Sequence, residues 1–370
     1  MKIINLVGAR PQFIKAAMLS RALRRQRGVE EIMVHTGQHY DASMSDDILK
    51  ELEFPVIAHN LGINRLSHGA MTGRMIESLE QVFRQERPDA LIVYGDTNST
   101  LAGAVAAVKL GIRIAHVEAG MRCNNLHVPE EANRVVADRL SEWLFTSSDH
   151  ARQNLIREGY DNLPVQLIHS GDVMLDAFRH FQPIAQERIS WPQEMPQGDF
   201  VLCTVHREAT TEHPGRLREV FEAIERVHQR IPVVLPLHPR TRERIGALGI
   251  KTSAILTEPA SYLQMLVLLD RCALVMTDSG GLQKEAFFSK KPCVTLRPET
   301  EWIELVEHGY NKVVGTDPQW IVNHVFWMLD NPPEFRHHFY GDGHAADLIA
   351  AQLIKPSIHS VRKDQPANLA

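Results

Sequence analysis

The sequence of 370 residues contains little that would place the protein in a membrane, outside the cell or on nucleic acid. Its apolar tract YLQMLVLLDRCALVM is interrupted by Asp270 and Arg271 and is too short to span a bilayer. The first residues, MKIINLVGARPQ, have too short an apolar stretch for a signal peptide. The formal net charge of −5 gives no reason to expect nucleic acid or an anionic membrane surface as a partner. We therefore expect a cytoplasmic protein.

Cysteine is also scarce. The four cysteines are widely separated and form no CxxC pair, so a disulfide framework or a thiolate zinc site is not expected. They are Cys123, Cys203, Cys272 and Cys293. The sequence has no HExxH motif or Cys/His spacing that would indicate another metal site, and we expect no bound metal.

Short runs rich in β-branched residues are present throughout the chain and predict strands. Many are apolar at consecutive positions, as is typical of parallel strands that are covered on both faces. The runs are 3–7, 31–35, 90–94, 112–117, 144–146 and 165–169, followed by 200–205, 233–237, 273–277 and 293–296. Helical patterns lie between them, at 11–25, 69–84, 100–110, 130–144, 216–229 and 281–289. This alternation predicts an α/β fold with doubly wound parallel sheets.

The series of strands and helices runs twice. The break at residues 171–199 is rich in proline and polar residues and indicates a linker. We predict two Rossmann-like domains, at residues 1–172 and 173–339. Because ligands bind at the carboxyl ends of strands in such sheets, the active site is expected in the cleft between the two domains.

Polar motifs follow several of the predicted strands. In GARPQFIK, Arg10 lies at a helix N-terminus with Lys15 one turn later, a position that favours a phosphate or carboxylate, although a plain turn with two solvated cations is an equal alternative. In GDTNST, Asp96 follows a strand, and helix capping can explain most of this stretch. His206 and His238 each end a strand of the second domain and could hydrogen-bond a phosphate or sugar.

The motif DSGGLQKEA lies between a predicted buried strand and a helix. Ser279, Gly280 and Gly281 would allow backbone N–H groups to approach the phosphates of a ligand. Glu285 lies in the same helix, where a carboxylate could accept hydrogen bonds from ribose hydroxyls. The motif therefore indicates a nucleotide site in the second domain.

The segment HVEAGMRCNNLHVPEEANR, residues 116–134, concentrates charge just after a predicted strand. Glu130 and Arg134 would lie on one helical face, where an exposed pair contributes about 0.2–0.5 kcal/mol. That explanation does not cover Glu118 and Arg122, which lie on the loop. Carboxylates that converge with cations in a cleft indicate proton transfer beside a bound anion.

Together these motifs resemble the non-hydrolysing UDP-N-acetylglucosamine 2-epimerase family. The matching stretches, in order, are GARPQFIK, TGQHYD, GDTNST, HVEAGMR, PEEANR, HRE, LHPRT, EPASYL and DSGGLQKEA. The resemblance implies the glycosyltransferase-B arrangement of two domains, usually as a homodimer, with a C-terminal helix at about 340–360 that packs back on the first domain. A role in the biosynthesis of polysaccharides that contain N-acetylmannosamine is also implied.

The family reaction inverts C2 of the sugar and converts UDP-GlcNAc to UDP-ManNAc. The resemblance implies elimination of UDP, a 2-acetamidoglucal intermediate and re-addition of UDP. No nicotinamide or metal is needed, because no hydride leaves and UDP is both leaving group and nucleophile. The expected partner is thus a UDP-sugar.

The resemblance also assigns site residues, without deciding which group transfers which proton. The catalytic set is Asp96, Glu118, Glu130 and His206. The substrate and UDP set is Arg10, Lys15, Arg134, His238, Tyr262, Ser279, Gly280, Gly281 and Glu285.

Some positions depart from the family pattern. The chain has Gly-Ala-Arg-Pro-Gln where familiar members have Gly-Thr-Arg-Pro-Glu. Gln38 and Arg74 match a second, activating substrate site of some bacterial relatives, but Asp41 replaces a further glutamine, so activation stays open. The stretches GARPQFIKAA, MSDD and KPCVTLRPETEW resemble the branch that acts on UDP-2,3-diacetamido-2,3-dideoxyglucuronic acid, which makes this sugar the alternative substrate.

Three other functions remain as alternatives. A hydrolysing epimerase would release the sugar from UDP, and a glycosyltransferase of the same fold would need an acceptor site. A regulator that only binds nucleotide sugars would have no use for several carboxylates beside a diphosphate.

Overall fold

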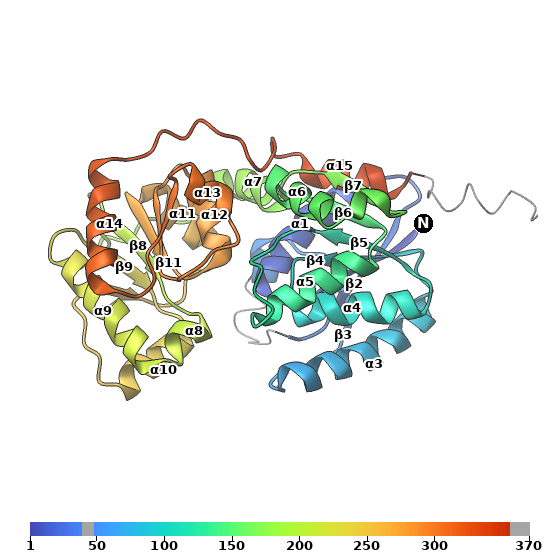
Figure 1. Cartoon of the computed structure of the whole chain (residues 1–370), viewed down its shortest axis with the longest axis horizontal. Coiled ribbons are helices and arrows are strands. Elements are labelled where there is room, and N and C mark those ends of the chain that lie inside the picture. The colour runs from blue at the N-terminus through green and yellow to red at the C-terminus, as the bar shows by residue number, and fades with distance from the viewer. Residues whose placement is uncertain (39–47, 356–370) are drawn as a thin grey trace, which may run out of the picture. The chain divides into compact units, whose positions relative to one another are not determined.

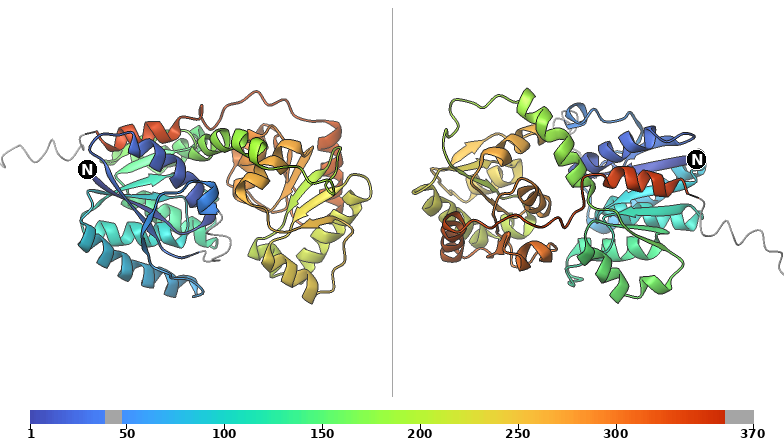
Figure 2. Two further views of the ribbon diagram at one scale, coloured as in Figure 1. Left: turned by 180° about the vertical axis from the view of Figure 1, so that it is seen from behind. Right: turned by 90° about the horizontal axis from the view of Figure 1, so that it is seen from above.

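The computed structural model describes residues 1–38 and 48–355. The chain divides into two compact units, one formed by residues 1–177 with the described residues from 339 onward and the other by residues 178–338. In each unit, helices cover both faces of a parallel sheet (Figures 1 and 2). This confirms the predicted α/β class with two Rossmann-like domains. Among the described residues, no helix combines the length and apolar character needed to cross a membrane.

The sheet of the amino-terminal unit has the strand order β3-β2-β1-β4-β5-β6-β7, and its described strands pair in parallel. The strands are β1 (Lys2–Val7), β2 (Glu30–His35), β3 (Ile57–Asn60), β4 (Ala90–Tyr94), β5 (Arg113–Val117), β6 (Trp143–Thr146) and β7 (Gln166–His169). The order reverses between β1 and β4, and ligands of doubly wound sheets bind at the carboxyl ends of strands beside such a switch point.

Helices line both faces of this sheet. They are α1 (Arg10–Arg24), α3 (His68–Glu86), α4 (Asn98–Lys109), α5 (Pro129–Leu140), α6 (Asp149–Arg157) and α15 (Ala345–Leu353), with a 3-10 turn η1 (Tyr160–Asn162). Helix α4 packs between α3 and α5, whereas α15 packs against α1 (Figure 1). The small residues of α4 allow close approach to the sheet, since a Cβ atom on Gly103 would lie 2.4 Å from Leu6 Cδ2.

The second unit has a sheet in the order β10-β9-β8-β11-β12-β13, also parallel. Its strands are β8 (Val201–Thr204), β9 (Val233–Pro236), β10 (Ile255–Thr257), β11 (Leu274–Thr277), β12 (Cys293–Thr295) and β13 (Asn311–Val313). Its helices are α8 (Glu208–Thr211), α9 (Pro214–His228), α10 (Pro239–Ala247), α11 (Tyr262–Arg271), α12 (Gly280–Phe288), α13 (Ile303–Glu307) and α14 (Pro318–Asp330). Alternate residues of β8 enter two separate apolar clusters, Val201 and Cys203 in one and Leu202 in the other, so the sheet is buried on both faces.

Helix α7 (Val173–Arg188) corrects the predicted linker at residues 171–199. Pro183 lies inside this helix, where a proline removes one hydrogen bond and costs about 3 kcal/mol or more. The helix persists because Phe181 and Ala185, on either side of the proline, are buried. The boundary between the two units, at residues 177 and 178, falls within α7.

Further differences include helices outside the predicted patterns, such as α6, α10, α11 and α14, and several short strands and helix ends. Strands β3, β10 and β13 were not predicted, because they are three or four residues long, only partly buried, and stand at sheet edges. The helix predicted at 130–144 ends at Leu140, because Ser141 has an extended backbone and β6 begins at Trp143. The C-terminal helix, predicted at about 340–360, is α15 over 345–353, and residues 356–360 lie outside the described residues.

Candidate active site

Two of the predicted catalytic carboxylates lie at the carboxyl ends of neighbouring strands. Asp96 follows β4 and Glu118 follows β5. Because these strands pair in parallel, both residues lie at the carboxyl ends of the strands, on the same side of the sheet. Asp96 Oδ2 accepts a hydrogen bond from Arg134 Nη2 at 2.5 Å, and Glu118 forms an ion pair with Lys15 Nζ. Lys15 and Arg134 are both buried, with 6% and 4% of their surface exposed. Each carboxylate is therefore paired with a cation that is largely shielded from solvent.

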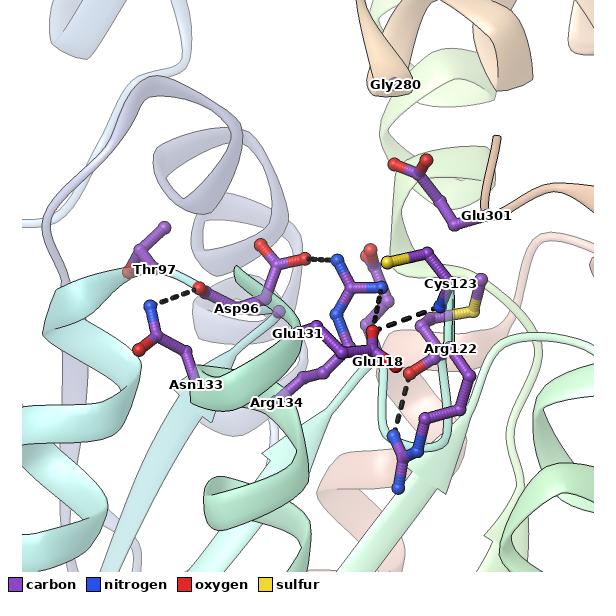
Figure 3. A network of polar contacts seen from close by, with 12 residues as sticks. Asp96, Thr97, Glu118, Arg122, Cys123, Glu131, Asn133, Arg134, Gly280 and Glu301 are labelled. Atoms are coloured by element: carbon purple, nitrogen blue, oxygen red, sulfur yellow. Dashed lines mark hydrogen bonds and ion pairs between the residues drawn. The ribbon is translucent and has the colours of Figure 1, made fainter. Parts of the chain in front are cut away.

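Arg134 is held from a second side by Glu131, a residue that the sequence analysis did not select (Figure 3). Arg134 Nη1 lies 3.2 Å from Glu131 Oε2. The carboxylate of Glu131 also accepts hydrogen bonds from the backbone N–H groups of Cys123 and Asn124, at 3.0 and 2.9 Å. Glu131 is buried, whereas its neighbour Glu130, the predicted catalytic residue, is half-buried in the first turn of α5.

The backbone at Glu118 is strained. Its φ angle of 76° lies in the left-handed region, which costs a residue with a side chain about 1–3 kcal/mol. The backbone N–H groups of Glu118 and Ala119 both donate to the carbonyl of Phe145 at 3.0 Å, which holds this conformation in place. Strain that the surrounding structure holds in place is typical of functional loops, and here it directs one carboxylate.

Gln12, one of the positions that depart from the Gly-Thr-Arg-Pro-Glu pattern, connects two loops of this site. Its Oε1 accepts hydrogen bonds from the N–H groups of Gly8 and Ala9 at 2.7 and 3.1 Å. Its Nε2 donates to the carbonyl of Tyr94 at 2.8 Å, at the end of β4. An amide can both donate and accept, so Gln12 joins the start of α1, where Arg10 lies, to the strand end before Asp96.

Arg122, which the sequence placed on the same loop, pairs with two carboxylates outside the predicted catalytic set. Its guanidinium is buried and pairs with Asp138 at 2.8 Å and with Glu158 at 2.7 and 2.8 Å. This corrects the expectation that Arg122 is a cation of the cleft. Its ion pairs with Asp138 and Glu158 instead stabilise the loop after β5. Sequence spacing could not show this, because Asp138 and Glu158 lie 16 and 36 residues away.

Asn133 adds a further contact beneath Asp96, and it too was missed as a site residue. Its Nδ2 donates to the backbone carbonyl of Asp96 at 2.9 Å (Figure 3). The same Nδ2 donates to Asn98 Oδ1 at 3.2 Å. The motif PEEANR contained the signal, but helical periodicity alone does not say which of its polar side chains face the loop after β4.

In the second unit, the structure brings the two predicted histidines together. His206 follows β8 and His238 caps α10 after β9, and their ring centroids are 5.8 Å apart. His238 Nδ1 accepts a hydrogen bond from the N–H of Arg240 at 3.2 Å, which leaves Nε2 as the protonated nitrogen of a neutral ring. The loop of His206 is held by buried Asp278, which accepts from the N–H groups of His206 and Arg207 at 2.9 Å.

The motif DSGGLQKEA forms the turn into α12, as predicted. Ser279 is the N-cap, and Gly280 begins the helix. Trp302 Nε1 donates to the carbonyl of Gly280 at 2.9 Å, and a Cβ atom on Gly280 would lie 2.6 Å from Glu301 Oε1. Backbone N–H groups at a helix N-terminus favour anions such as phosphate, and a phosphate site at this turn stays a prediction.

The remaining predicted binding residues of this unit lie in helices α11 and α12. Gly281 is the second residue of α12, and Glu285 is a buried residue of the same helix. Tyr262 begins α11 with 2% of its surface exposed and packs edge-on against Phe181 at 5.8 Å. Their roles, and the predicted location of the active site between the domains, stay predictions.

The residues of the possible activating site are also placed in part. Gln38 Oε1 accepts hydrogen bonds from the N–H and hydroxyl of Ser99 at 3.0 and 2.7 Å. Arg74 has an exposed side chain 3.9 Å from Glu77. Asp41 lies outside the described residues. Within residues 1–38 and 48–355, no group of three or more His, Cys, Asp or Glu side chains is arranged to hold a metal ion.

Comparisons with known proteins agree with this arrangement. A family model described as UDP-N-acetylglucosamine 2-epimerase matches residues 21–354. The chain is 46% identical over 356 residues to the UDP-2,3-diacetamido-2,3-dideoxy-D-glucuronate 2-epimerase of Pseudomonas aeruginosa, which covers 96% of this chain and 100% of that relative. It is 34% identical over 377 residues to the UDP-N-acetylglucosamine 2-epimerase of Escherichia coli K12, with coverage of 95% and 98%.

A solved structure shows the same fold. The UDP-GlcNAc 2-epimerase of Methanocaldococcus jannaschii, in complex with UDP-GlcNAc and UDP, superimposes with a TM-score of 0.87 at 33% identity. The alignment covers 95% of this chain and 99% of that one.

Proposed function

The chain belongs to the UDP-N-acetylglucosamine 2-epimerase family and is a UDP-sugar 2-epimerase, and from this premise we propose that it inverts C2 of a UDP-linked 2-acetamido sugar without hydrolysis. One observation carries the proposal: Asp96 and Glu118 lie at adjacent strand ends, and each is paired with a buried cation. Carboxylates at such positions can exchange protons with a sugar ring, while cations balance the charge of a diphosphate.

The proposed reaction proceeds by elimination and re-addition. A base removes the proton from C2, the electron pair of that C–H bond forms a C1=C2 double bond, and the bond from C1 to the diphosphate oxygen breaks. The intermediate is a 2-acetamidoglucal beside free UDP. A UDP oxygen then attacks C1 while C2 receives a proton on the opposite face, so that no atom or electron is gained or lost overall.

The chemistry explains why cations and acids are needed together. A C2 hydrogen is weakly acidic, so its removal must be coupled to departure of the diphosphate. Lys15, Arg134 and Arg10 would stabilise negative charge on the site, and the N-terminus of α12 would bind phosphate oxygens. Retention of the glucal beside UDP supplies an effective concentration that free solution cannot reach.

For the sugar itself, the comparisons favour the alternative over UDP-GlcNAc. The identity to the P. aeruginosa diacetamido-glucuronate epimerase, 46%, exceeds the 34% to the E. coli UDP-GlcNAc epimerase. We therefore propose UDP-2,3-diacetamido-2,3-dideoxyglucuronic acid as the substrate. UDP-GlcNAc is the second candidate, because the M. jannaschii structure of the same fold is a complex with UDP-GlcNAc.

Proton NMR in D₂O tests both parts of the proposal. Purified protein is incubated with each sugar in separate tubes, and the C2 proton signal and the anomeric signals are followed. Deuterium at C2 with a new C2 epimer still attached to UDP, in the diacetamido uronic acid tube alone, is the expected result. Exchange only with UDP-GlcNAc would transfer the function to the second candidate.

The same spectra separate the other functions. Release of the free sugar with UDP would indicate a hydrolysing epimerase. Binding of UDP without exchange in either tube would contradict the proposal and leave a glycosyltransferase or a nucleotide-sugar-binding regulator.

A further inference from the structure

A fully buried histidine lies next to the loops that carry Asp96 and Glu118. His116 is the fourth residue of β5, two residues before Glu118, and its side chain has no exposed surface. Its Nε2 lies 2.7 Å from the carbonyl oxygen of Gly95, and its Nδ1 lies 2.7 Å from Asp138 Oδ1. A carbonyl oxygen can only accept, so Nε2 must carry a hydrogen.

Whether Nδ1 of His116 carries a hydrogen depends on whether the carboxyl group of Asp138 is ionised. Asp138 Oδ2 accepts hydrogen bonds from Arg122 Nη1 at 2.8 Å and from the N–H of Gly120 at 3.2 Å. Burial raises the pKa of Asp138, but the charges and hydrogen bonds of His116 and Arg122 outweigh burial and hold this pKa below its usual value. An ionised carboxylate only accepts, so Nδ1 of His116 must also carry a hydrogen.

The charges of the buried cluster support the same state. The buried guanidinium of Arg122 pairs with the buried carboxylate of Asp138 and, on its other side, with Glu158, whose side chain is 37% exposed. Tyr160, which also faces this cluster, contributes no charge, because burial raises its pKa to about 12. A protonated Asp138 would leave Arg122 without its buried counter-ion, so the ionised carboxylate is favoured, and with it a hydrogen on Nδ1 of His116.

The cluster is connected to both catalytic loops. Gly95, whose carbonyl binds His116, directly precedes Asp96 and has a left-handed φ of 58°. Gly120, whose N–H binds Asp138, follows Glu118 by two residues and has a φ of 81°. The chain from Gly95 through the ring and Asp138 to Gly120 therefore joins one carboxylate loop to the other through hydrogen bonds alone.

We propose that His116 is a buried imidazolium at neutral pH and a positioning residue that sets the separation between Asp96 and Glu118. It touches no substrate and acts through the two loops. Its protonation state follows from the contacts of the ring and of Asp138, whereas its effect on turnover rests on the proposed function. A displacement of about 1 Å at reacting groups can cost about 100-fold in rate, so such a connection has a measurable effect.

The protonation state is tested in the resting protein, without substrate. Nitrogen-15 NMR of the full chain labelled at histidine reports both ring nitrogens, and the His116 signals are identified by their loss in His116→Gln. Two protonated nitrogens at pH 7.5 are expected. In Asp138→Asn the carboxylate is gone, and one of the two nitrogens should lose its hydrogen. A neutral ring in the wild-type chain would overturn the proposal.

The positioning role is tested by kinetics on the same variants. His116→Gln and Asp138→Asn should each lower kcat for C2 exchange by about 10- to 100-fold, while KM and UDP affinity stay within about twofold. The matched control is His59→Gln, which removes another histidine–carboxylate pair, His59 with Glu86 at 2.9 Å, from edge strand β3. The control should keep wild-type kcat.

The outcomes separate the two proposals. If the NMR shows an imidazolium but both variants turn over at the wild-type rate, the positioning role is wrong and the epimerase proposal stands. If the wild-type chain exchanges C2 in no sugar, the proposed function fails, while the NMR result still decides the state of His116. If both variants lose kcat, UDP affinity and circular dichroism together, His116 is needed for folding only, and the positioning role is overturned.

Discussion

At the scale of single residues, the site depends on which carboxylates are paired and which are positioned by the backbone. Glu118 combines an ion pair to Lys15 with a left-handed backbone, while Asp96 is bound by Arg134 and Asn133. The three partner side chains come from two helices, α1 and α5, and of the two carboxylates Glu118 has the left-handed backbone.

Glu118→Gln should abolish epimerisation while UDP binding persists. An amide has the same shape but cannot take or give the proton, and loss of general acid–base catalysis costs about 10²- to 10⁴-fold in rate. Deuterium exchange at C2 measures the rate, and titration calorimetry with UDP should give a Kd within about twofold of wild type. Glu80→Gln, an exposed glutamate of α3 paired with Arg84, is the control and should be fully active. Normal exchange in Glu118→Gln would remove this residue from the catalytic set.

The residues that the sequence missed are those whose role depends on the direction in which their side chains point. The motif PEEANR contains two adjacent glutamates: the family resemblance assigns a catalytic role to Glu130, which stays a prediction, and the structure shows Glu131 as a buried partner of Arg134. Adjacent residues of a helix point about 100° apart, and only the packing of α5 decides which of them faces the loop after β5.

At the scale of elements, the start of α12 shows how a glycine serves a binding site. Gly280 has an ordinary helical backbone, so Gly280→Ala should change the free energy of unfolding by less than about 1 kcal/mol. The new Cβ would meet Glu301 Oε1 at 2.6 Å and shift either that side chain or the helix N-terminus.

We therefore expect Gly280→Ala to raise the Kd for UDP about tenfold, which corresponds to about 1.4 kcal/mol. Titration calorimetry measures the affinity, and urea unfolding measures the stability. Gly215→Ala is matched to it, because Gly215 lies in the first turn of α9 in the same unit, with open space around a Cβ atom. Equal UDP affinity in both variants would contradict a phosphate site at the start of α12.

The docking of α15 should make stability depend on pH. Asp176 of α7 accepts hydrogen bonds from the N–H groups of Ala345 and Ala346 at 3.1 and 2.7 Å, where α15 begins. Burial nevertheless raises the pKa of Asp176 to about 6, above the usual value of about 3.9. The folded chain therefore binds this proton more tightly than the unfolded chain, and stability is lost as pH rises from about 4 to about 6.

Asp176→Asn removes the titration. The free energy of unfolding of the wild type minus that of the variant should fall by about 2–3 kcal/mol as pH rises from 4 to 7. Urea unfolding at a series of pH values measures this difference. Parallel curves for the two chains, with a constant difference, would show that Asp176 does not titrate in this range.

The sequence predicted the central elements better than the marginal ones. Long apolar runs such as β1 and β4 were predicted, because a strand buried on both faces leaves a continuous apolar signal. The short edge strands and the helix through Pro183 were missed, because tertiary packing overrides weak or contrary local preference there.

At the scale of the whole molecule, each unit repeats the same design. In the first, catalytic candidates follow β4 and β5 beside the reversal between β1 and β4. In the second, His206 follows β8 and Ser279 lies just after β11, beside the reversal between β8 and β11. The predicted catalytic carboxylates thus belong to one unit, whereas His206 and the predicted phosphate site belong to the other.

The homodimer implied by the family resemblance is a prediction at this scale. Size-exclusion chromatography with light scattering should give twice the mass of one chain at micromolar concentration, with and without UDP. A monomeric mass under both conditions would contradict it.

The sequence by itself determined the α/β class, the two Rossmann-like domains, the family and the strand ends that carry the candidate site residues, because hydrophobic periodicity and ordered motifs are local signals along the chain. Only the tertiary structure decided that Glu131 rather than Glu130 holds Arg134, that Arg122 stabilises the loop after β5, and that His116 and Asp138 join the loops of the two carboxylates. The physical reason is that the contacts of Arg122 and His116 join residues on different elements, 16 to 36 positions apart, and that the direction and burial of every one of these side chains exist only after the sheet and helices have packed.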